Sequence, residues 1–155
     1  MPLKQTEIEN IFGKFDYIEL GGGRIRIDSQ WVKKNILKVK LPILGIVEFH
    51  KKVKKQLKNV FKEIKNKKLE KEIDLEDYRR LGGTFVPRHI LWNPEKPLSH
   101  HSWGIAIDIN VSKNPYGKPP NQHPEVVKIF KKHGFEWGGD WNLSDGMHFE
   151  VVKIL

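Results

Sequence analysis

A small set of histidine and aspartate residues in the second half of the chain could bind a metal ion. His100 and His101 precede a short apolar segment that contains Asp108, and His148 stands near the C-terminus. Two imidazoles and one carboxylate can occupy three corners of a tetrahedral zinc site and leave the fourth for water, as catalytic zinc requires. Because the chain has no cysteine, thiolate-bound zinc and iron–sulfur sites are excluded, and any metal must bind His, Asp or Glu.

Asp108 lies in a segment whose pattern predicts a β-strand over residues 103–109. Large apolar side chains alternate there with smaller residues, in the order Trp103, Gly104, Ile105, Ala106, Ile107, Asp108 and Ile109. The small residues leave open volume beside the carboxylate of Asp108. A carboxylate in such an apolar strand is costly to bury unless a cation or hydrogen-bond donors meet it.

The spacing leaves open which histidine joins Asp108. Seven positions separate His101 from Asp108, so in an unbroken strand these two side chains would point to opposite faces. By this parity His100 is the better partner. His101 can take the place only if the chain turns between Ser102 and Gly104.

Two motifs in this part of the chain resemble a known family. Residues 99–108 read SHHSWGIAID and match S-x-H-x-x-G-x-A-x-D, and residues 145–148 read DGMH and match D-x-x-H. Together they resemble the zinc peptidases of the D-alanyl-D-alanine carboxypeptidase family, which includes vancomycin-resistance D,D-peptidases and the L-alanyl-D-glutamate endopeptidases of phage lysins. Residues 85–88 and 134–141 agree further, so the similarity covers residues 78–152.

The resemblance implies a role for each matching residue. It implies that one Zn²⁺ per chain is bound by His101, Asp108 and His148, with His100 as the fallback for His101. It also implies that Asp145 is a carboxylate general base, which takes a proton from water and passes it to the leaving amine.

An arginine that grips a substrate carboxylate completes the family pattern, and Arg88 matches its position. Relatives often carry this arginine in a Ser-Gly-Tyr-Arg stretch, whereas residues 86–88 here read VPR. Arg79 and Arg80 are therefore alternatives. Glu150 has two interpretations: it orients a ligand histidine, or it is a solvent-facing strand residue.

The function that the resemblance implies is hydrolysis of peptide bonds in peptidoglycan stem peptides, by metal-activated water with a carboxylate base. Carboxypeptidase, dipeptidase and L-Ala–D-Glu endopeptidase activities share these motifs, so the bond that is cut stays open. The alternative is a non-hydrolytic zinc-binding module, as in the signalling domain of hedgehog proteins. Such a module has no use for a carboxylate three residues before its last ligand, so Asp145 favours hydrolysis.

The surrounding elements predict a single α+β domain over residues 1–155, with the metal and catalytic motifs in residues 84–152. A long amphipathic helix over residues 45–67 precedes a β-rich half, and the resemblance implies a hedgehog/D,D-peptidase-like fold whose small antiparallel sheet carries the zinc site. Helices are also expected at 5–14, 74–81 and 124–132, and strands at 15–20, 24–27 and 147–155. The glycine triplet at residues 21–23 predicts a plain turn.

The charge and composition of the chain limit the classes of partner that it is expected to bind. The chain has 28 Lys and Arg against 19 Asp and Glu, a net charge of +9, and lysine dominates residues 51–71. This lysine run is either a solvated helix face or a surface that attracts a polyanion such as the anionic cell wall. It has almost no Arg, Asn or Gln to read base edges, so specific nucleic-acid binding is not expected.

No apolar run resembles a secretory signal or a membrane span. We therefore expect synthesis in the cytoplasm, action on the cell wall after release or export, and a monomeric protein.

Overall fold

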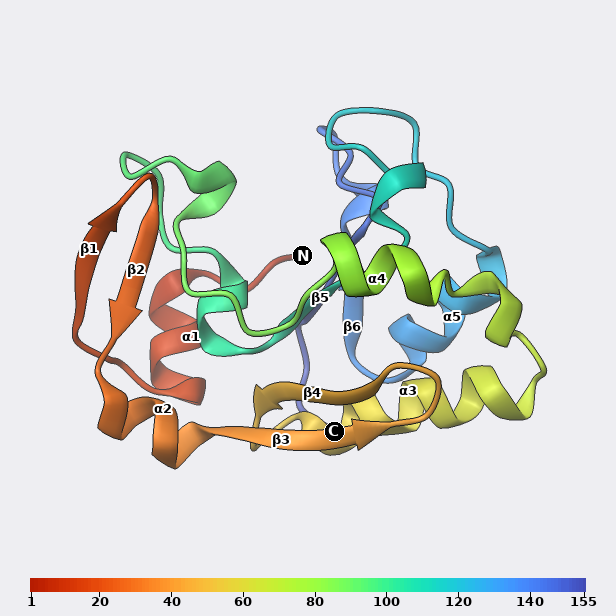
Figure 1. Cartoon of the computed structure of the whole chain (residues 1–155), viewed down its shortest axis with the longest axis horizontal. Helices are drawn as coiled ribbons and strands as arrows, with labels where there is room; N and C mark the ends of the chain where they lie inside the picture. Colours follow the sequence, from red (N-terminus) through yellow and green to blue (C-terminus); the bar gives the residue numbers. More distant parts are fainter.

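Three small antiparallel sheets and five α-helices make up the fold, in a computed structural model that describes residues 1–155. The helices are α1 (Gln5–Phe12), α2 (Ser29–Asn35), α3 (Lys54–Asn66), α4 (Leu75–Leu81) and α5 (Pro124–Lys132). The strands are β1 (Tyr17–Gly21), β2 (Arg24–Ile27), β3 (Ile36–Leu41), β4 (Gly45–His50), β5 (Ala106–Asp108), β6 (Phe135–Trp137) and β7 (His148–Val151). The β1–β2 hairpin lies at the left end of the molecule in Figure 1, and α5 lies towards the right end.

Most of the elements predicted from the sequence are present. The helix predicted at 5–14 is α1, that at 74–81 is α4, and that at 124–132 is α5. Strands β1 and β2 pair antiparallel around the glycine triplet as predicted, although β1 begins two residues later than expected and includes Gly21. Asp74 begins α4 by accepting a hydrogen bond from the Asp77 N–H, as an N-cap aspartate does.

The long helix predicted over residues 45–67 is wrong in its first part. Residues 45–50 form strand β4, which pairs with β3, and the helix α3 begins only at Lys54. The apolar side of an amphipathic helix over this range would include Ile46, but Ile46 is 67% exposed, whereas Val47 and Phe49 are buried. The segment therefore alternates with the period of a strand, and the helical spacing of its apolar residues was a coincidence.

A three-stranded sheet in the order β5-β7-β6 replaces the longer strands predicted near the C-terminus. The strand expected over 103–109 is shortened to β5, and the one expected over 147–155 is shortened to β7. Strand β7 lies in the centre, so both of its edges are paired. Its register places His148 directly opposite Asp108 and Glu150 opposite Ala106.

One buried core of 30 hydrophobic residues joins both halves of the chain. Helix α3 contributes Leu57, Val60, Phe61 and Ile64, and it packs against β3 and α5. The chain is therefore a single small α+β domain, as predicted. None of its helices combines the length and the apolar character needed to cross a membrane.

Candidate metal centre

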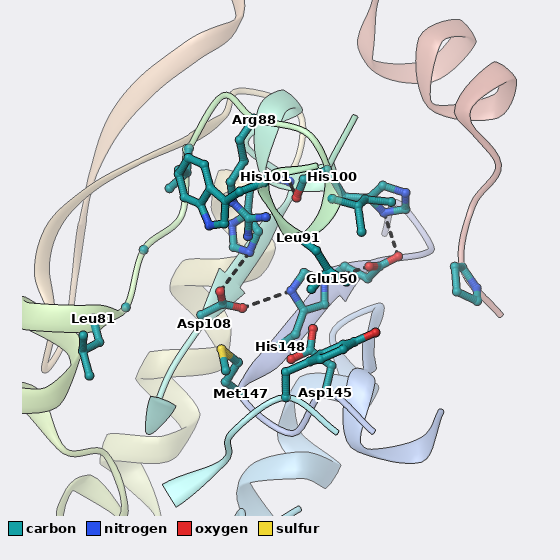
Figure 2. Close-up of a pocket in the computed structure, with 18 of the residues that line it drawn as sticks. Leu81, Arg88, Leu91, His100, His101, Asp108, Asp145, Met147, His148 and Glu150 are labelled. Carbon is teal, nitrogen blue, oxygen red and sulfur yellow. Dashed lines mark hydrogen bonds and ion pairs between the residues drawn. The ribbon is translucent and has the colours of Figure 1, made fainter. Parts of the chain in front are cut away.

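Two histidines and one aspartate converge at the edge of the β5–β7 pair. One ligand atom from each of His101, Asp108 and His148 lies within 4.8 Å of the other two. The Nε2 atom of His101 is 3.2 Å from Oδ2 of Asp108, and Nδ1 of His148 is 3.0 Å from Oδ1. Figure 2 shows the carboxylate of Asp108 between the two imidazole rings. The three residues that the family motif selects are thus brought together.

His101 reaches Asp108 because the chain turns between them. Residues His100–Trp103 form a 3₁₀ turn, and Gly104 follows in the left-handed region at φ 66°. Glycine adopts this conformation without steric cost. The turn breaks the strand parity that favoured His100, so the sequence motif and the parity argument no longer conflict.

Asp108 and His148 meet because they are direct cross-strand partners in the register of β5 and β7. On the other side of β5, the Asp108 N–H donates to the Gly83 carbonyl at 3.0 Å. A Cβ atom on Gly82 would lie 2.6 Å from the Asp108 carbonyl oxygen. The glycine pair after α4 therefore lets a second segment of chain approach the strand that presents the carboxylate.

A backbone carbonyl sets the orientation of the His101 ring. Nδ1 of His101 donates to the carbonyl of Thr84 at 2.9 Å, and the ring is 1% exposed. This fixes the tautomer whose Nε2 carries a lone pair. Nε2 is buried and makes no hydrogen bond. An unpartnered imidazole nitrogen aimed at a carboxylate suits a metal ligand.

Glu150 orients the second histidine. Nε2 of His148 contacts Oε1 of Glu150 at 2.8 Å, which leaves Nδ1 to face Asp108. Glu150 is 3% exposed, so its interpretation as a solvent-facing residue is wrong. His100 does not join the metal cluster; its Nδ1 lies 2.7 Å from the other oxygen of Glu150.

The electrostatics of the cluster favour a bound cation. Burial disfavours the charged form of Asp108, but the imidazoles of His101 and His148 outweigh it and hold the pKa of Asp108 below its usual range. Burial likewise opposes the charge on His148, yet hydrogen bonds to Asp108 and Glu150 raise its pKa to about 10. The buried carboxylates thus attract positive charge, and a divalent cation can replace the proton between His148 and Asp108.

Asp145 lines the same cavity as the three metal-binding candidates. Burial raises its pKa above the ordinary value, with His148 acting in the opposite direction. The next residue, Gly146, accepts hydrogen bonds at its carbonyl from Trp137 Nε1 (2.8 Å) and Gln122 Nε2 (3.1 Å). The loop that presents Asp145 is therefore fixed on two sides, and the environment makes its carboxylate a stronger base.

Arg88, rather than Arg79 or Arg80, lines the cavity with these residues. The other two arginines lie in the last turn of α4 and are exposed. Burial lowers the pKa of Arg88, while the charges of Asp108 and Asp145 favour its guanidinium form. The guanidinium lies near the cluster in Figure 2.

The cavity has a volume of about 650 Å³, which is enough for a short peptide segment. Several of the side chains that form its walls are not predicted from the sequence: Leu81, Ile90, Leu91, Trp92, Tyr116 and Trp141. No local pattern marks such residues, because they come from four separate segments of the chain. The run of three apolar residues at 90–92 is the one feature of the sequence that could have indicated part of this wall.

Replacing Glu150 by glutamine should weaken zinc binding about tenfold, because the amide loses the charge that orients His148. The measurement is a competition titration of the protein against a coloured zinc chelator. Glu136→Gln is a matched control, since Glu136 lies directly opposite Glu150 on β6 and forms its ion pair with the N-terminal amine rather than with a histidine. Equal zinc affinity in the two variants would mean that Glu150 has no part in the centre.

Comparison with known proteins agrees with this geometry. Residues 93–151 match the model of a family described as D-alanyl-D-alanine carboxypeptidase. A stretch of 68 residues is 38% identical to the peptidoglycan L-alanyl-D-glutamate endopeptidase CwlK of Bacillus subtilis (strain 168), covering 35% of this chain and 40% of that relative. No solved structure matches the chain significantly. The resemblance to the D-alanyl-D-alanine carboxypeptidase family is therefore confirmed for the part of the chain that carries the His/Asp/His cluster.

Proposed function

We propose that this protein is a zinc-dependent peptidase that hydrolyses peptide bonds in peptidoglycan stem peptides. The observation that carries the proposal is the presence of His101, Asp108 and His148 in one cavity with Asp145 and Arg88. The relative from Bacillus subtilis, by its name, acts on the L-alanyl-D-glutamate bond of peptidoglycan. That relative supports the substrate class, and carboxypeptidase and endopeptidase types both fit the residues.

The donor set fits zinc. Two neutral imidazole nitrogens and one carboxylate oxygen are ligands that zinc accepts, and three protein ligands are typical of its catalytic sites. The unpartnered Nε2 of His101 and the charge of Asp108 support the same assignment. Zinc bound by these residues would polarise a scissile carbonyl and lower the pKa of a water molecule.

The side chains around the cluster supply the remaining steps. Asp145 accepts a proton from the attacking water at a carboxylate oxygen and then donates it to the leaving amine nitrogen. Its raised pKa suits both roles. Arg88 binds a free carboxylate of the stem peptide through paired N–H donors and so fixes the position of the scissile bond.

We also propose that the chain has the fold type that the hedgehog signalling domain shares with the D,D-peptidases. The sheet of β5, β7 and β6 would then be the one beside the zinc site. A module that only binds zinc needs no base in the cavity. The position of Asp145 in the cavity wall supports the hydrolytic interpretation.

A direct test uses a synthetic stem peptide and the purified protein. Removal of metal with a chelator should stop release of new amino groups, and addition of one equivalent of zinc should restore it. A protein that binds zinc fully and leaves every peptide bond intact would be a binding module.

The lysine face of the protein consists of Lys55, Lys58, Lys62, Lys65 and Lys68, on and just after α3. None of these lysines forms an ion pair, whereas Lys67 contacts Glu63 at 3.4 Å. We propose that this face holds the protein on the anionic cell wall, where it acts after release or export. Charges on an exposed face act over about 10 Å at moderate salt and are screened beyond that distance.

Replacing Lys55, Lys62 and Lys65 by glutamine should therefore weaken cosedimentation with purified walls and flatten its dependence on salt. Lys38→Gln with Lys40→Gln, two exposed changes on β3, is the control. If wall binding by the native protein does not change between low and physiological salt, the lysine face is only a solvated surface.

A further inference from the structure

We propose that Trp92 is a positioning residue for Arg88, and that the β1–β2 hairpin holds Trp92 in place. The hairpin would then influence which peptides with a free carboxylate are bound. This inference rests on the proposed function, because it concerns how the substrate is held. It involves residues 21–27 and 88–92, which lie outside the segment that matches the family.

The guanidinium of Arg88 packs against the face of the Trp92 ring instead of pairing with an acidic side chain. Its carbon lies 4.9 Å from the centre of the Trp92 ring, and its one hydrogen bond, from Nη1 to the His89 carbonyl, is 3.3 Å long. No acidic side chain forms an ion pair with it. A carboxylate partner would occupy the N–H donors of an arginine, whereas an aromatic face attracts the cation and leaves those donors free. The arrangement suits an arginine that must bind a carboxylate ligand.

The backbone of Arg88 is fixed independently of its side chain. Its N–H donates to Oγ of Ser102 at 3.0 Å, and that hydroxyl donates back to the Arg88 carbonyl at 2.9 Å. Only the long side chain is left to be oriented. The Trp92 ring and the long hydrogen bond to the His89 carbonyl are the contacts that orient the guanidinium.

Trp92 also contacts the hairpin. The guanidinium carbon of Arg24, on β2, lies 5.3 Å from the centre of the Trp92 ring. Arg24 is exposed, whereas Arg88 lines the cavity. The ring is thus shared by a cation of the hairpin and a cation of the cavity. An antiparallel bridge between Arg24 and Arg88 also joins β2 to residues 88–92.

The turn that presents Trp92 adopts a conformation that residues other than glycine rarely adopt. Leu91 and Trp92 have φ values of 54° and 56°, both in the left-handed region. Such strain persists only where the surroundings impose it, and it concentrates at functional sites. Hydrogen bonds from Ile90 N to the Pro97 carbonyl (2.9 Å) and from Trp92 N to the His89 carbonyl (3.1 Å) hold the turn.

Gly23 is the point where the hairpin supports this turn. A Cβ atom at Gly23 would lie 2.2 Å from the carbonyl carbon and oxygen of Trp92. The Gly23 carbonyl also accepts a hydrogen bond from the His89 N–H at 2.8 Å. Any side chain at residue 23 would displace Trp92. The third glycine of the triplet therefore does more than complete a turn.

The first test compares Trp92→Ala with Trp92→Phe on two stem peptides, one with free carboxylates and one with its carboxylates amidated. We expect Trp92→Ala to raise KM about fivefold for the free peptide, with kcat within about twofold of the native value, in line with the strength of a cation–π contact. Trp92→Phe should restore most of the KM. An equal loss on both peptides, or a loss confined to kcat, would contradict the proposal.

Two matched pairs test the support from the hairpin. Gly23→Ala should raise KM as Trp92→Ala does, whereas Gly22→Ala should not, because Gly22 has the same left-handed backbone but no atom within 4 Å of its added Cβ. Arg24→Ala should have a smaller effect in the same direction, and Arg26→Ala, its exposed neighbour on β2, should have none. Equal effects within either pair would overturn this role of the hairpin.

A measurement without turnover separates this proposal from the proposed function. In the zinc-loaded protein, the Nε–Hε signal of Arg88 should move during NMR titration with N-acetyl-D-alanine, and Trp92→Ala should weaken the Kd about fivefold. The same Kd in both proteins would refute the positioning role. If the native protein binds this probe through Arg88 but cleaves no stem peptide, the peptidase function fails and the positioning role stands.

Discussion

Replacing Asp145 by asparagine is expected to lower kcat on stem peptides by about a thousandfold while zinc binding is unchanged. The amide cannot accept a proton from water, and positioned carboxylates contribute about 10²- to 10⁴-fold to such reactions. Asparagine has nearly the same shape as aspartate, so the loop held through the Gly146 carbonyl should keep its place. Stopped assays with a synthetic stem peptide, together with zinc content by atomic absorption, measure both quantities.

Asp140→Asn is the matched control for this variant. Asp140 lies five residues earlier, is exposed, and forms an ion pair with Lys131 outside the cavity. Its variant should keep native activity. If Asp145→Asn hydrolyses the peptide at the native rate, the base is a different residue and the mechanism proposed above is wrong.

Replacing His148 by alanine is expected to remove zinc and, with it, all activity. The substitution leaves two of the three protein ligands and breaks the contacts of His148 with Asp108 and Glu150. Zinc content should fall from about one ion per chain to a small fraction, since catalytic sites rely on three protein ligands. Atomic absorption after dialysis against a weak chelator gives the stoichiometry.

His133→Ala is the control, because the His133 ring contacts Glu63 and does not line the cavity. The loss of His148 also removes one partner from each of two buried carboxylates, so that Asp108 keeps only His101 and Glu150 keeps only His100, and this can destabilise the fold. Asp108→Asn is therefore a second variant: it keeps the volume and lowers the charge, so it should fold and still bind zinc weakly. A folded His148→Ala protein that retains stoichiometric zinc would exclude His148 as a ligand.

The candidate site could be predicted from the sequence because its residues lie in two short motifs. The spacing of the site residues is local within each motif, SHHSWGIAID and DGMH. The family resemblance indicated His101 as the ligand, whereas strand parity favoured His100. The structure explains the choice through the turn at Gly104, a tertiary feature that the period of a strand cannot reveal.

The parts that could not be predicted depend on contacts between distant segments. The Thr84 carbonyl that orients His101 and the Glu150 carboxylate that orients His148 are known only once the strands are in register. The strand at residues 45–50 was missed because a long helical pattern follows it directly, and its partner β3 was not expected at all. Register and pairing are tertiary properties, and a short apolar run is compatible with either a strand or a helix.

The most direct test of zinc-dependent peptidase activity is mass analysis of the fragments released from purified peptidoglycan by the zinc-loaded protein. If the protein is a zinc-dependent peptidase, the stem peptides should be cut at one bond, and each cut should add the mass of one water. Chelation should stop the cutting, and return of zinc should restore it. Intact stem peptides in the presence of a protein that holds its full complement of zinc would contradict it.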